Sequence, residues 1–317
     1  MKRRDLYYLV KPAIPRPLQI YLRRKLIRKQ RRWTAHVWPV DPAAGDRPSE
    51  WHGWPGQKQF ALVLTHDVES AAGQEKCHGL MRLEQQLGFR SSFGFVPERY
   101  EVSAALRCDL RRQGFEVGVH GLNHDGRLFC SERIFRKRVA RINRYLQQWG
   151  AVGFRAPAMH HNLHWLHALD ILYDASTFDT DPFEPQADGV GTIYPFWVSG
   201  ENNGDGYVEL PYTLPQDFTL FVLMQESNAD VWKSKLDWIA RRGGMALMNT
   251  HPDYMCFAGH KPGLQEYDVQ HYREFLQYVK QKYAGQVWHV LPRDMARFWL
   301  SHRVERTARA AAKLLTH

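Results

Sequence analysis

Acidic and histidine side chains follow two apolar segments of this sequence at close spacing. Asp67 and Glu69 come directly after the apolar run at residues 60–64, and His120 and His124 follow another apolar segment, four residues apart. One carboxylate and two neutral imidazoles form a facial set of oxygen and nitrogen ligands that leaves coordination positions open for water and substrate. Hydrolytic metal sites need such open positions. These residues therefore predict a divalent-metal site, with zinc as the expected ion.

The two neighbouring carboxylates are expected to have separate tasks. One binds the ion, while the other stays off it and accepts a proton from the water, whose pKa the ion lowers toward ~7. The types and spacing of Asp67 and Glu69 leave open which of them is the ligand.

Other polar side chains follow further apolar runs of the chain, namely Arg155, Asp174, Asp179 and His251. Each is weak evidence alone, because a buried Asp beside an Arg is more often a structural ion pair than a catalytic one. Together they stand where the chemistry of a parallel barrel is found, just after the strands. We therefore treat them as candidate members of the same site.

The pattern of apolar residues predicts the elements that position these side chains. From residue 58 onward, short apolar runs alternate with helical patterns, which is typical of βαβ units. The expected strands are residues 60–65, 92–96, 115–120, 153–155, 172–176, 207–210, 245–250 and 287–291. The clearest expected helices, each followed by a glycine, are residues 131–149, 230–242 and 268–284. Seven or eight such units indicate an α/β fold with a closed or nearly closed parallel barrel.

The positive charge of the chain is concentrated at its start. The formal net charge is +10, yet residues 1–33 alone hold twelve Lys and Arg and one acidic residue, so the remainder is close to neutral. Residues 18–32 predict a short basic amphipathic helix, which suits an anionic membrane surface. A solvated arm that packs on the body is an equal alternative. Nucleic-acid binding ranks third, because no recognised binding motif accompanies the arm.

The sequence also bounds the location of the protein. No apolar run reaches the ~18 to 20 residues needed to cross a bilayer, and the first residues lack the pattern of a secretory signal. We therefore expect a cytoplasmic protein, with peripheral attachment to the inner face of the membrane through residues 1–33 as an option. The expected domains are residues 1–50 as a basic extension and connector, 51–300 as the catalytic domain, and 301–317 as a basic C-terminal helix.

Five short motifs in order carry a resemblance to a known family. T-H-D-V-E, H-G-L-N-H, R-A-P, D-A-S-T-F and N-T-H, spread over roughly residues 58–300, resemble the polysaccharide deacetylase family, also called the NodB homology domain or carbohydrate esterase family 4. This resemblance implies a distorted (β/α) barrel, whose divalent metal hydrolyses an N-acyl, sometimes an O-acyl, group of a sugar.

The resemblance also implies roles for single residues. Asp67 is the expected general base, His120 and His124 are the expected metal ligands, and Arg155 is expected to hold Asp67. The backbone N–H that follows Pro157 is expected to help bind the oxyanion.

Two further roles concern the leaving group and the third ligand. His251 is expected to protonate the leaving amine, and Asp174 to keep His251 charged. Where the commonest family pattern has the metal carboxylate, this chain has Val68. Because a D-x-D variant of the pattern exists, the resemblance assigns the metal carboxylate to Glu69.

The expected function is a metal-dependent N-deacetylase that acts on an N-acylated amino sugar in polysaccharide or lipid-linked glycan precursor synthesis, as part of cell-envelope biogenesis. Two alternatives remain: a deformylase of a lipid-linked amino sugar, and a non-catalytic carbohydrate-binding protein on the same fold. The sequence leaves the sugar and the acyl group open.

Overall fold

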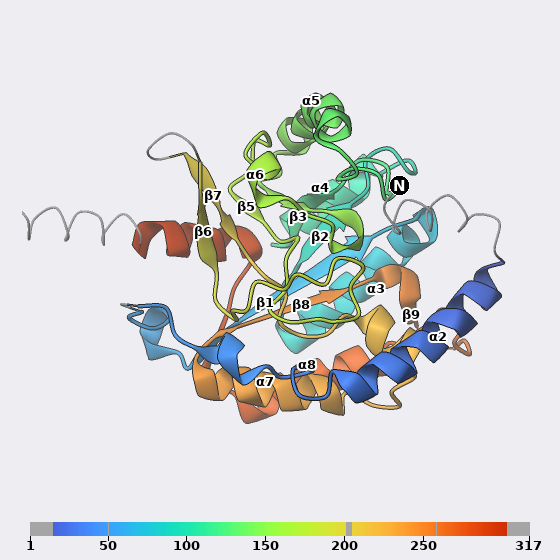
Figure 1. Ribbon diagram of the computed structural model, residues 1–317, viewed down its shortest axis with the longest axis vertical. Helices are drawn as coiled ribbons and strands as arrows, with labels where there is room; N and C mark the ends of the chain where they lie inside the picture. The colour runs from blue at the N-terminus through green and yellow to red at the C-terminus, as the bar shows by residue number, and fades with distance from the viewer. Residues whose placement is uncertain (1–14, 50, 201–204, 258, 303–317) are drawn as a thin grey trace, which may run out of the picture.

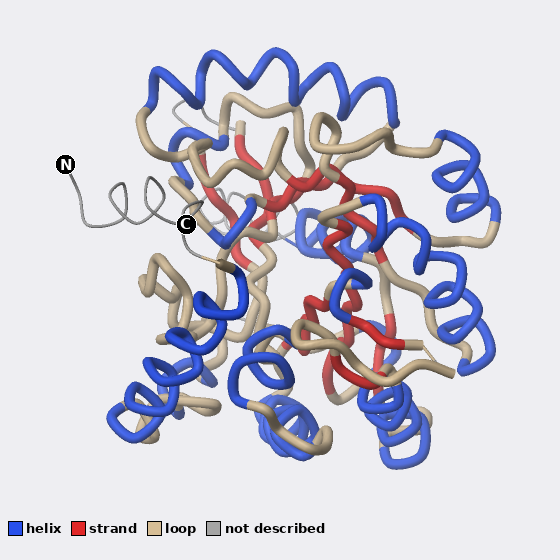
Figure 2. Tube along the Cα trace, turned by 90° about the vertical axis from the view of Figure 1, so that its right-hand side faces the viewer, coloured by secondary structure: helices blue, strands red, loops and turns tan. Residues whose placement is uncertain are grey.

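A curled sheet of mostly parallel strands forms the centre of the computed structural model, which describes residues 15–49, 51–200, 205–257 and 259–302. Within these residues, the eight mutually parallel strands of the sheet are β1 (Phe60–Val68), β2 (Ser92–Phe95), β3 (Glu116–His120), β4 (Gly153–Arg155), β5 (Tyr173–Asp174), β7 (Gly206–Glu209), β8 (Met245–Thr250) and β11 (Val287–His289). The expected parallel (β/α) barrel is thus confirmed, as an incompletely closed one (Figure 2). Each expected strand matches one of the eight.

The sheet approaches closure through an irregular segment rather than a full strand. Residues 212–214 lie between the chain after β5 and strand β8, with single bridges from Phe178 to Tyr212 and from Leu214 to Met248. The antiparallel strand β6 (Phe196–Ser199), which the sequence did not predict, forms a hairpin with β7 at the edge of the sheet (Figure 1). The segment after β7 therefore brings its side chains to the same edge as β1 and β8.

Strand β1 lies at the middle of the sheet. It pairs with β8 on one side, and on the other with β11 at its start and with β2 at its end. All nine of its residues are buried, as expected for a strand covered on both faces. Its pairing with β2 continues to Val68, so Asp67 lies inside the strand rather than after the expected end at residue 65.

Helices surround the sheet on the outside. Those with both ends in the described ranges are α2 (Arg16–Trp33), α3 (Ala71–Leu87), α4 (Ala104–Arg112), α5 (Glu132–Trp149), α6 (Leu163–Leu166), α7 (Asp230–Arg242) and α8 (Gln270–Lys282). A further helix begins at residue 292 and continues to the last described residue. Helix α5 has the expected caps, because Ser131 accepts a hydrogen bond from the N–H of Ile134 and Gly150 adopts a φ of 51°. Helices α7 and α8 run side by side along the bottom of Figure 1. None of the helices in the described ranges is long and apolar enough to cross a membrane.

The N-terminal helix α2 packs on the body of the protein. Its buried side chains are Ile20 and Ile27, and it lies against the short π-helix η5 (Phe218–Met224). The chain that follows is also integrated, since Trp38 and Ala44 belong to the main apolar core. The expected C-terminal helix at residues 301–317 lies almost wholly outside the described residues.

Candidate active site

The predicted site residues come together at the carboxyl edge of the sheet. Asp67 lies near the end of β1, His120 ends β3, Arg155 ends β4, and His251 directly follows β8. In parallel α/β sheets this edge is where loops assemble a site. The sequence placed these side chains at strand ends, and the fold brings those ends together.

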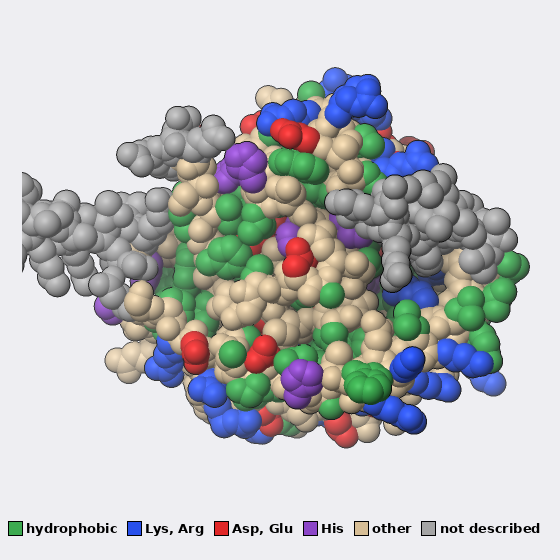
Figure 3. Space-filling model, viewed as in Figure 1, with side chains coloured by type: hydrophobic (Ala, Val, Ile, Leu, Met, Phe, Trp, Pro, Cys, Tyr) green, Lys and Arg blue, Asp and Glu red, His purple; other side chains and the backbone are tan. Residues whose placement is uncertain are grey.

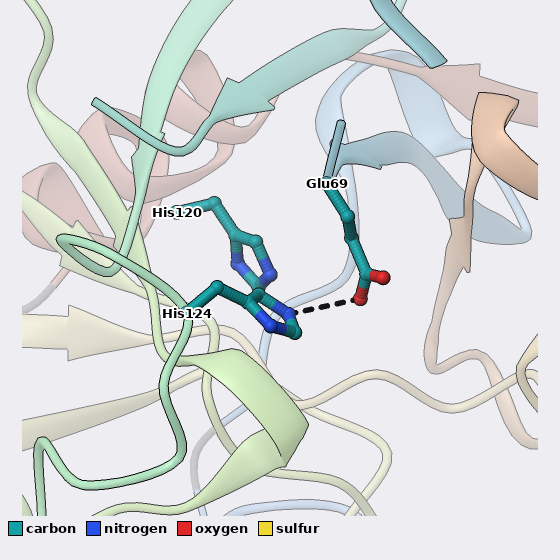
Figure 4. Close-up of side chains that lie close together, drawn as sticks. All are labelled: Glu69, His120 and His124. Carbon is teal, nitrogen blue, oxygen red and sulfur yellow. Dashed lines mark ion pairs between the residues drawn. The ribbon is translucent and has the colours of Figure 1, made fainter. Parts of the chain in front are cut away.

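Glu69, His120 and His124 form a compact group of possible metal ligands. One ligand atom from each lies within 4.8 Å of the other two, and the three side chains point toward a common centre (Figure 4). The Nε2 atom of His124 lies 2.9 Å from Oε1 of Glu69. Among the described residues, this is the one group of three or more His, Cys, Asp or Glu side chains with such spacing.

His120 is oriented so that one ring nitrogen is left for a ligand. Its Nδ1–H donates a hydrogen bond of 3.1 Å to the carbonyl of Arg155, while its buried Nε2 has no hydrogen-bond partner in the described structure. Burial outweighs the nearby Asp67 and lowers the pKa of His120 to about 4, so the ring is neutral at pH 7. A neutral imidazole whose Nδ1–H is fixed by a carbonyl is how proteins commonly present a histidine to a metal. The residues present therefore fit a divalent ion.

Glu69 is held in place by groups that the sequence analysis did not identify. The hydroxyl of Tyr254 donates to Oε2 of Glu69 at 2.9 Å, and the backbone N–H of Glu69 donates to Asp253 at 2.8 Å. Burial alone would raise the pKa of Glu69, but His124 and the other imidazoles outweigh it and hold that pKa well below its usual range. Glu69 is therefore a carboxylate, as a metal ligand must be.

Asp67 lies beside the trio but has a different set of partners. Asn249 donates to its Oδ2 at 2.8 Å, Arg155 to its Oδ1 at 3.3 Å, and Nδ1 of His120 lies 3.6 Å away. Arg155 itself is fixed by Thr65 and Asn249, at 2.8 Å and 2.6 Å. Burial raises the pKa of Asp67, but the combined effect of His120, Arg155 and His251 lowers it below the ordinary value. Asp67 is thus a positioned anion with Arg155 against it.

The carboxylate that pairs with His251 is Asp217, so the expected pairing with Asp174 is wrong. Nδ1 of His251 lies 2.7 Å from Oδ1 of Asp217, and the backbone N–H of His251 donates to the same carboxylate at 2.8 Å. Burial would lower the pKa of His251, but Asp217, with smaller contributions from Glu69 and Asp67, raises it to about 10. The free Nε2 of His251 lies 4.0 Å from both Asp67 and Glu69, facing the site.

Asp174 instead supports the backbone next to the site. Its carboxylate accepts hydrogen bonds from the hydroxyl and the backbone N–H of Ser176, and the Ser176 hydroxyl in turn accepts one from the N–H of Ala156. Burial raises the pKa of Asp174. Asp179 is likewise buried away from the ligands, 2.7 Å from Lys235. The sequence missed Asp217 because residues 212–217 carry no regular strand pattern that would mark Asp217 as a strand-end position.

The loops after β3 and β4 are packed tightly against each other. Gly121 has a φ of 64°, and a Cβ atom on it would come within 2.5 Å of Cδ of Pro157. His124, Ala158 and Met159 also have positive φ angles, between 52° and 55°. Non-glycine residues in this region are strained, and such strain is found preferentially at functional sites.

Comparison with solved structures shows similarity over most of the chain. A Mycobacterium smegmatis protein assigned as a polysaccharide deacetylase has 18% identity and a TM-score of 0.59, with 81% of this chain and 96% of that one covered. A Pseudomonas aeruginosa PAO1 protein with the same assignment has 17% identity and a TM-score of 0.62, covering 83% and 98%. A Puue allantoinase has 17% identity and a TM-score of 0.59, also covering 83% and 98%. No protein-family model and no curated protein matches the sequence. The similarity shows that the chain has the NodB-type polysaccharide deacetylase fold.

Proposed function

From this fold, we propose that the protein is a divalent-metal-dependent hydrolase that removes an acyl group from the nitrogen of an amino sugar. The observation that carries the proposal is the approach of Glu69, His120 and His124 to one centre, with Asp67 and His251 on its border. A carbohydrate-binding module would need no such combination of ligands, a buried base and a buried acid.

Glu69, His120 and His124 would hold the ion, for which zinc is our first candidate. Zinc suits a mixed carboxylate and imidazole set with open positions. When bound, a divalent ion supplies a Lewis acid toward the acyl carbonyl and lowers the pKa of water.

Asp67 is the proposed general base. Its carboxylate would accept the proton of the attacking water, while the hydrogen bonds from Asn249 and Arg155 keep it oriented and ionised. The position of Asp67 next to the ligand group, but turned toward Arg155 and Asn249, supports this separation of tasks between the two carboxylates.

His251 is the proposed general acid. Its Nε2–H would donate a proton to the leaving nitrogen, and Asp217 on the opposite ring nitrogen favours the protonated ring. The backbone N–H of Ala158 is the proposed donor to the acyl oxygen as negative charge develops on it.

The proposed substrate is an N-acylated amino sugar, with a lipid-linked glycan precursor as the favoured carrier. The comparison proteins assigned as polysaccharide deacetylases support the sugar, and the allantoinase shows that this fold also accommodates hydrolysis at other amide-type bonds. The acyl group is acetyl or formyl, which the following measurement separates.

The test is a screen for release of acetate and of formate from amino-sugar nucleotides, lipid-linked amino sugars and amino-sugar oligosaccharides. We expect release by the wild type, loss of release in Asp67→Asn and His120→Ala, and full release in the control His78→Ala, which changes a histidine on α3 away from the site. Equal release by the wild type and both site variants would mean that the activity does not belong to this site. Purified protein without stoichiometric divalent metal and insensitive to chelators would favour the binding module.

A further inference from the structure

Helix α2 presents two different faces, of which only one packs on the protein. On the inner face, Ile20 is buried and Ile27 packs in a small apolar cluster with η5. Arg24 on the same side donates to the carbonyl of Val222 at 2.9 Å and to that of Leu264 at 3.3 Å. These contacts fix the rotation of the helix about its own axis. They therefore also determine which residues form the outer face, turned away from the protein.

The outer face of α2 gathers the exposed large apolar side chains of the described structure. They are Leu18, Tyr21, Leu22, Leu26 and Trp33, with exposures between 46% and 73%. The one other such residue in the described ranges, Leu264, belongs to the loop whose carbonyl Arg24 contacts. Several exposed large apolar side chains gathered in one region of a surface point to an interaction site. We call these six residues the apolar patch.

Basic side chains lie on the same outer face as the apolar patch, between and beside its members. Lys25, Arg28, Lys29 and Arg32 are exposed on α2, and the helix contains no acidic residue. Figure 3 shows Lys and Arg side chains interspersed with apolar ones along the lower right edge of the molecule, where Figure 1 places α2. Exposed apolar side chains together with basic ones on one face of a helix suit the interface of an anionic bilayer, where apolar groups enter the headgroup region and basic groups meet lipid phosphates.

We propose that the outer face of α2 docks the protein on the surface of an anionic lipid bilayer, with the apolar patch inserted between headgroups and the basic side chains against lipid phosphates. The combination favours lipid over nucleic acid. Phosphate backbones are bound by positive charge, which gives no reason for leucine side chains on the same exposed face.

The docking helix is also close to the candidate active site. The guanidinium of Arg23 lies 5.1 Å from the ring of Phe218, which lies 4.6 Å from the ring of Tyr254, and Tyr254 donates to Glu69. A bilayer docked on the outer face would therefore lie near the site that accepts the acyl group, with helix α2 between the two. This consequence rests on the proposed function and gives a reason for a sugar carried on a lipid.

Vesicle co-sedimentation of the full chain tests the docking. We expect binding to vesicles that contain phosphatidylglycerol, weakened by salt, and little binding to pure phosphatidylcholine. Leu22→Gln/Leu26→Gln and Lys25→Glu/Lys29→Glu should each reduce binding by more than about tenfold.

The matched control is Arg133→Glu/Lys137→Glu, which makes the same change of charge at the same spacing on the exposed side of α5. It should keep most of the binding. Thermal unfolding of every variant checks that the fold is intact. Binding that is absent in the wild type, equal in all variants, or replaced by a shift of nucleic acid in gels would overturn the proposal.

The docking and the proposed function can fail separately. Vesicle binding is measured without any substrate, and the Asp67→Asn variant should bind vesicles like the wild type. The two α2 variants should hydrolyse a water-soluble acylated amino sugar at the wild-type rate but lose activity on the same sugar carried by a lipid in vesicles. Equal losses on both substrates would show that α2 affects the site itself and would contradict a docking role.

Discussion

At the scale of single residues, Asp67 and Glu69 differ in what they touch, although only Val68 separates them. Glu69 faces His124 at 2.9 Å, whereas Asp67 accepts hydrogen bonds from Asn249 and Arg155. A carboxylate that already has two donors is suited to proton transfer with a fixed geometry. A carboxylate that faces the ring nitrogens of two imidazoles is suited to bind a metal ion together with them.

This difference predicts opposite behaviour of two isosteric variants. Glu69→Gln should lose bound metal, because an amide is a weak ligand for a divalent ion. Asp67→Asn should keep stoichiometric metal and lose activity by ~10²–10⁴-fold, the range of a missing general base. Metal analysis by mass spectrometry, together with turnover measurements, checks both. Loss of metal from Asp67→Asn with retention in Glu69→Gln would reverse the two roles.

The pair of Asp217 and His251 gives a prediction about pH. In Asp217→Asn, the pKa of His251 should fall from about 10 toward its ordinary value, because the charge that favours the protonated ring is gone. A general acid must be protonated to act, so activity should be lost progressively as pH rises above ~6.5, whereas the wild type keeps it to higher pH. The measurement is kcat/KM as a function of pH.

Asp174→Asn is the matched comparison for that profile. Its carboxylate contacts Ser176 rather than His251, so this variant should be less stable to urea but keep the alkaline limb of the wild type. If Asp174→Asn lost activity at lower pH than the wild type while Asp217→Asn kept the wild-type pH profile, Asp174 rather than Asp217 would be the partner of His251.

At the scale of elements, two loops from neighbouring strands position the ligands by packing on each other. The loop after β3 carries His124 and the loop after β4 carries Ala158, and they meet at Gly121 and Pro157. The contact leaves no room for a Cβ atom on Gly121. The packing of the Gly121 backbone against the ring of Pro157 thus holds the loop that carries His124 close to the loop that carries the proposed oxyanion donor.

Gly121→Ala should therefore disturb both the fold and the site. We expect a loss of roughly 2–4 kcal/mol in the free energy of unfolding, from the unfavourable φ together with the clash against Pro157, and weaker metal binding. Gly88→Ala is the matched control, since Gly88 has a φ of 87° but nothing within 4 Å of its Cβ position. Urea unfolding of both variants separates the two causes. Equal losses would mean that the contact with Pro157 contributes nothing.

At the scale of the whole molecule, the proposed ion would join parts of the chain that are far apart in sequence. Glu69 follows β1, whereas His120 and His124 belong to β3 and its loop. An ion that binds the folded protein but not the unfolded one stabilises the fold by mass action. Its removal should therefore be visible in thermal unfolding without any assay of activity.

We expect zinc at about one hundred times its dissociation constant to raise the unfolding temperature by roughly 5 °C relative to chelated protein. The Glu69→Gln variant should show no such increase. Differential scanning fluorimetry with and without chelator measures both. An equal rise in wild type and Glu69→Gln would place the ion elsewhere.

Much of the architecture was predictable because local patterns encode it. The apolar run of β1, the caps of α5 at Ser131 and Gly150, and the alternation of strands and helices indicated the parallel fold. Because parallel strands have their carboxyl ends at one edge of the sheet, this topology also predicted that Asp67, His120 and His251 lie close together. The residue types at those ends are the basis of the predicted metal site.

The sequence by itself determined the eight parallel strands, the helices α5, α7 and α8, and the kinds of side chain at the ends of the strands. Only the tertiary structure decided that Asp217, rather than Asp174, pairs with His251, and that Ile20 and Ile27, rather than Leu22 and Leu26, face the protein. Both outcomes depend on contacts between segments that no local periodicity connects: the irregular bridge from residues 212–214 to β8, and the packing of α2 on η5. Sequence periodicity determines which residues share one face of a helix or strand. Tertiary packing determines which other segment that face contacts.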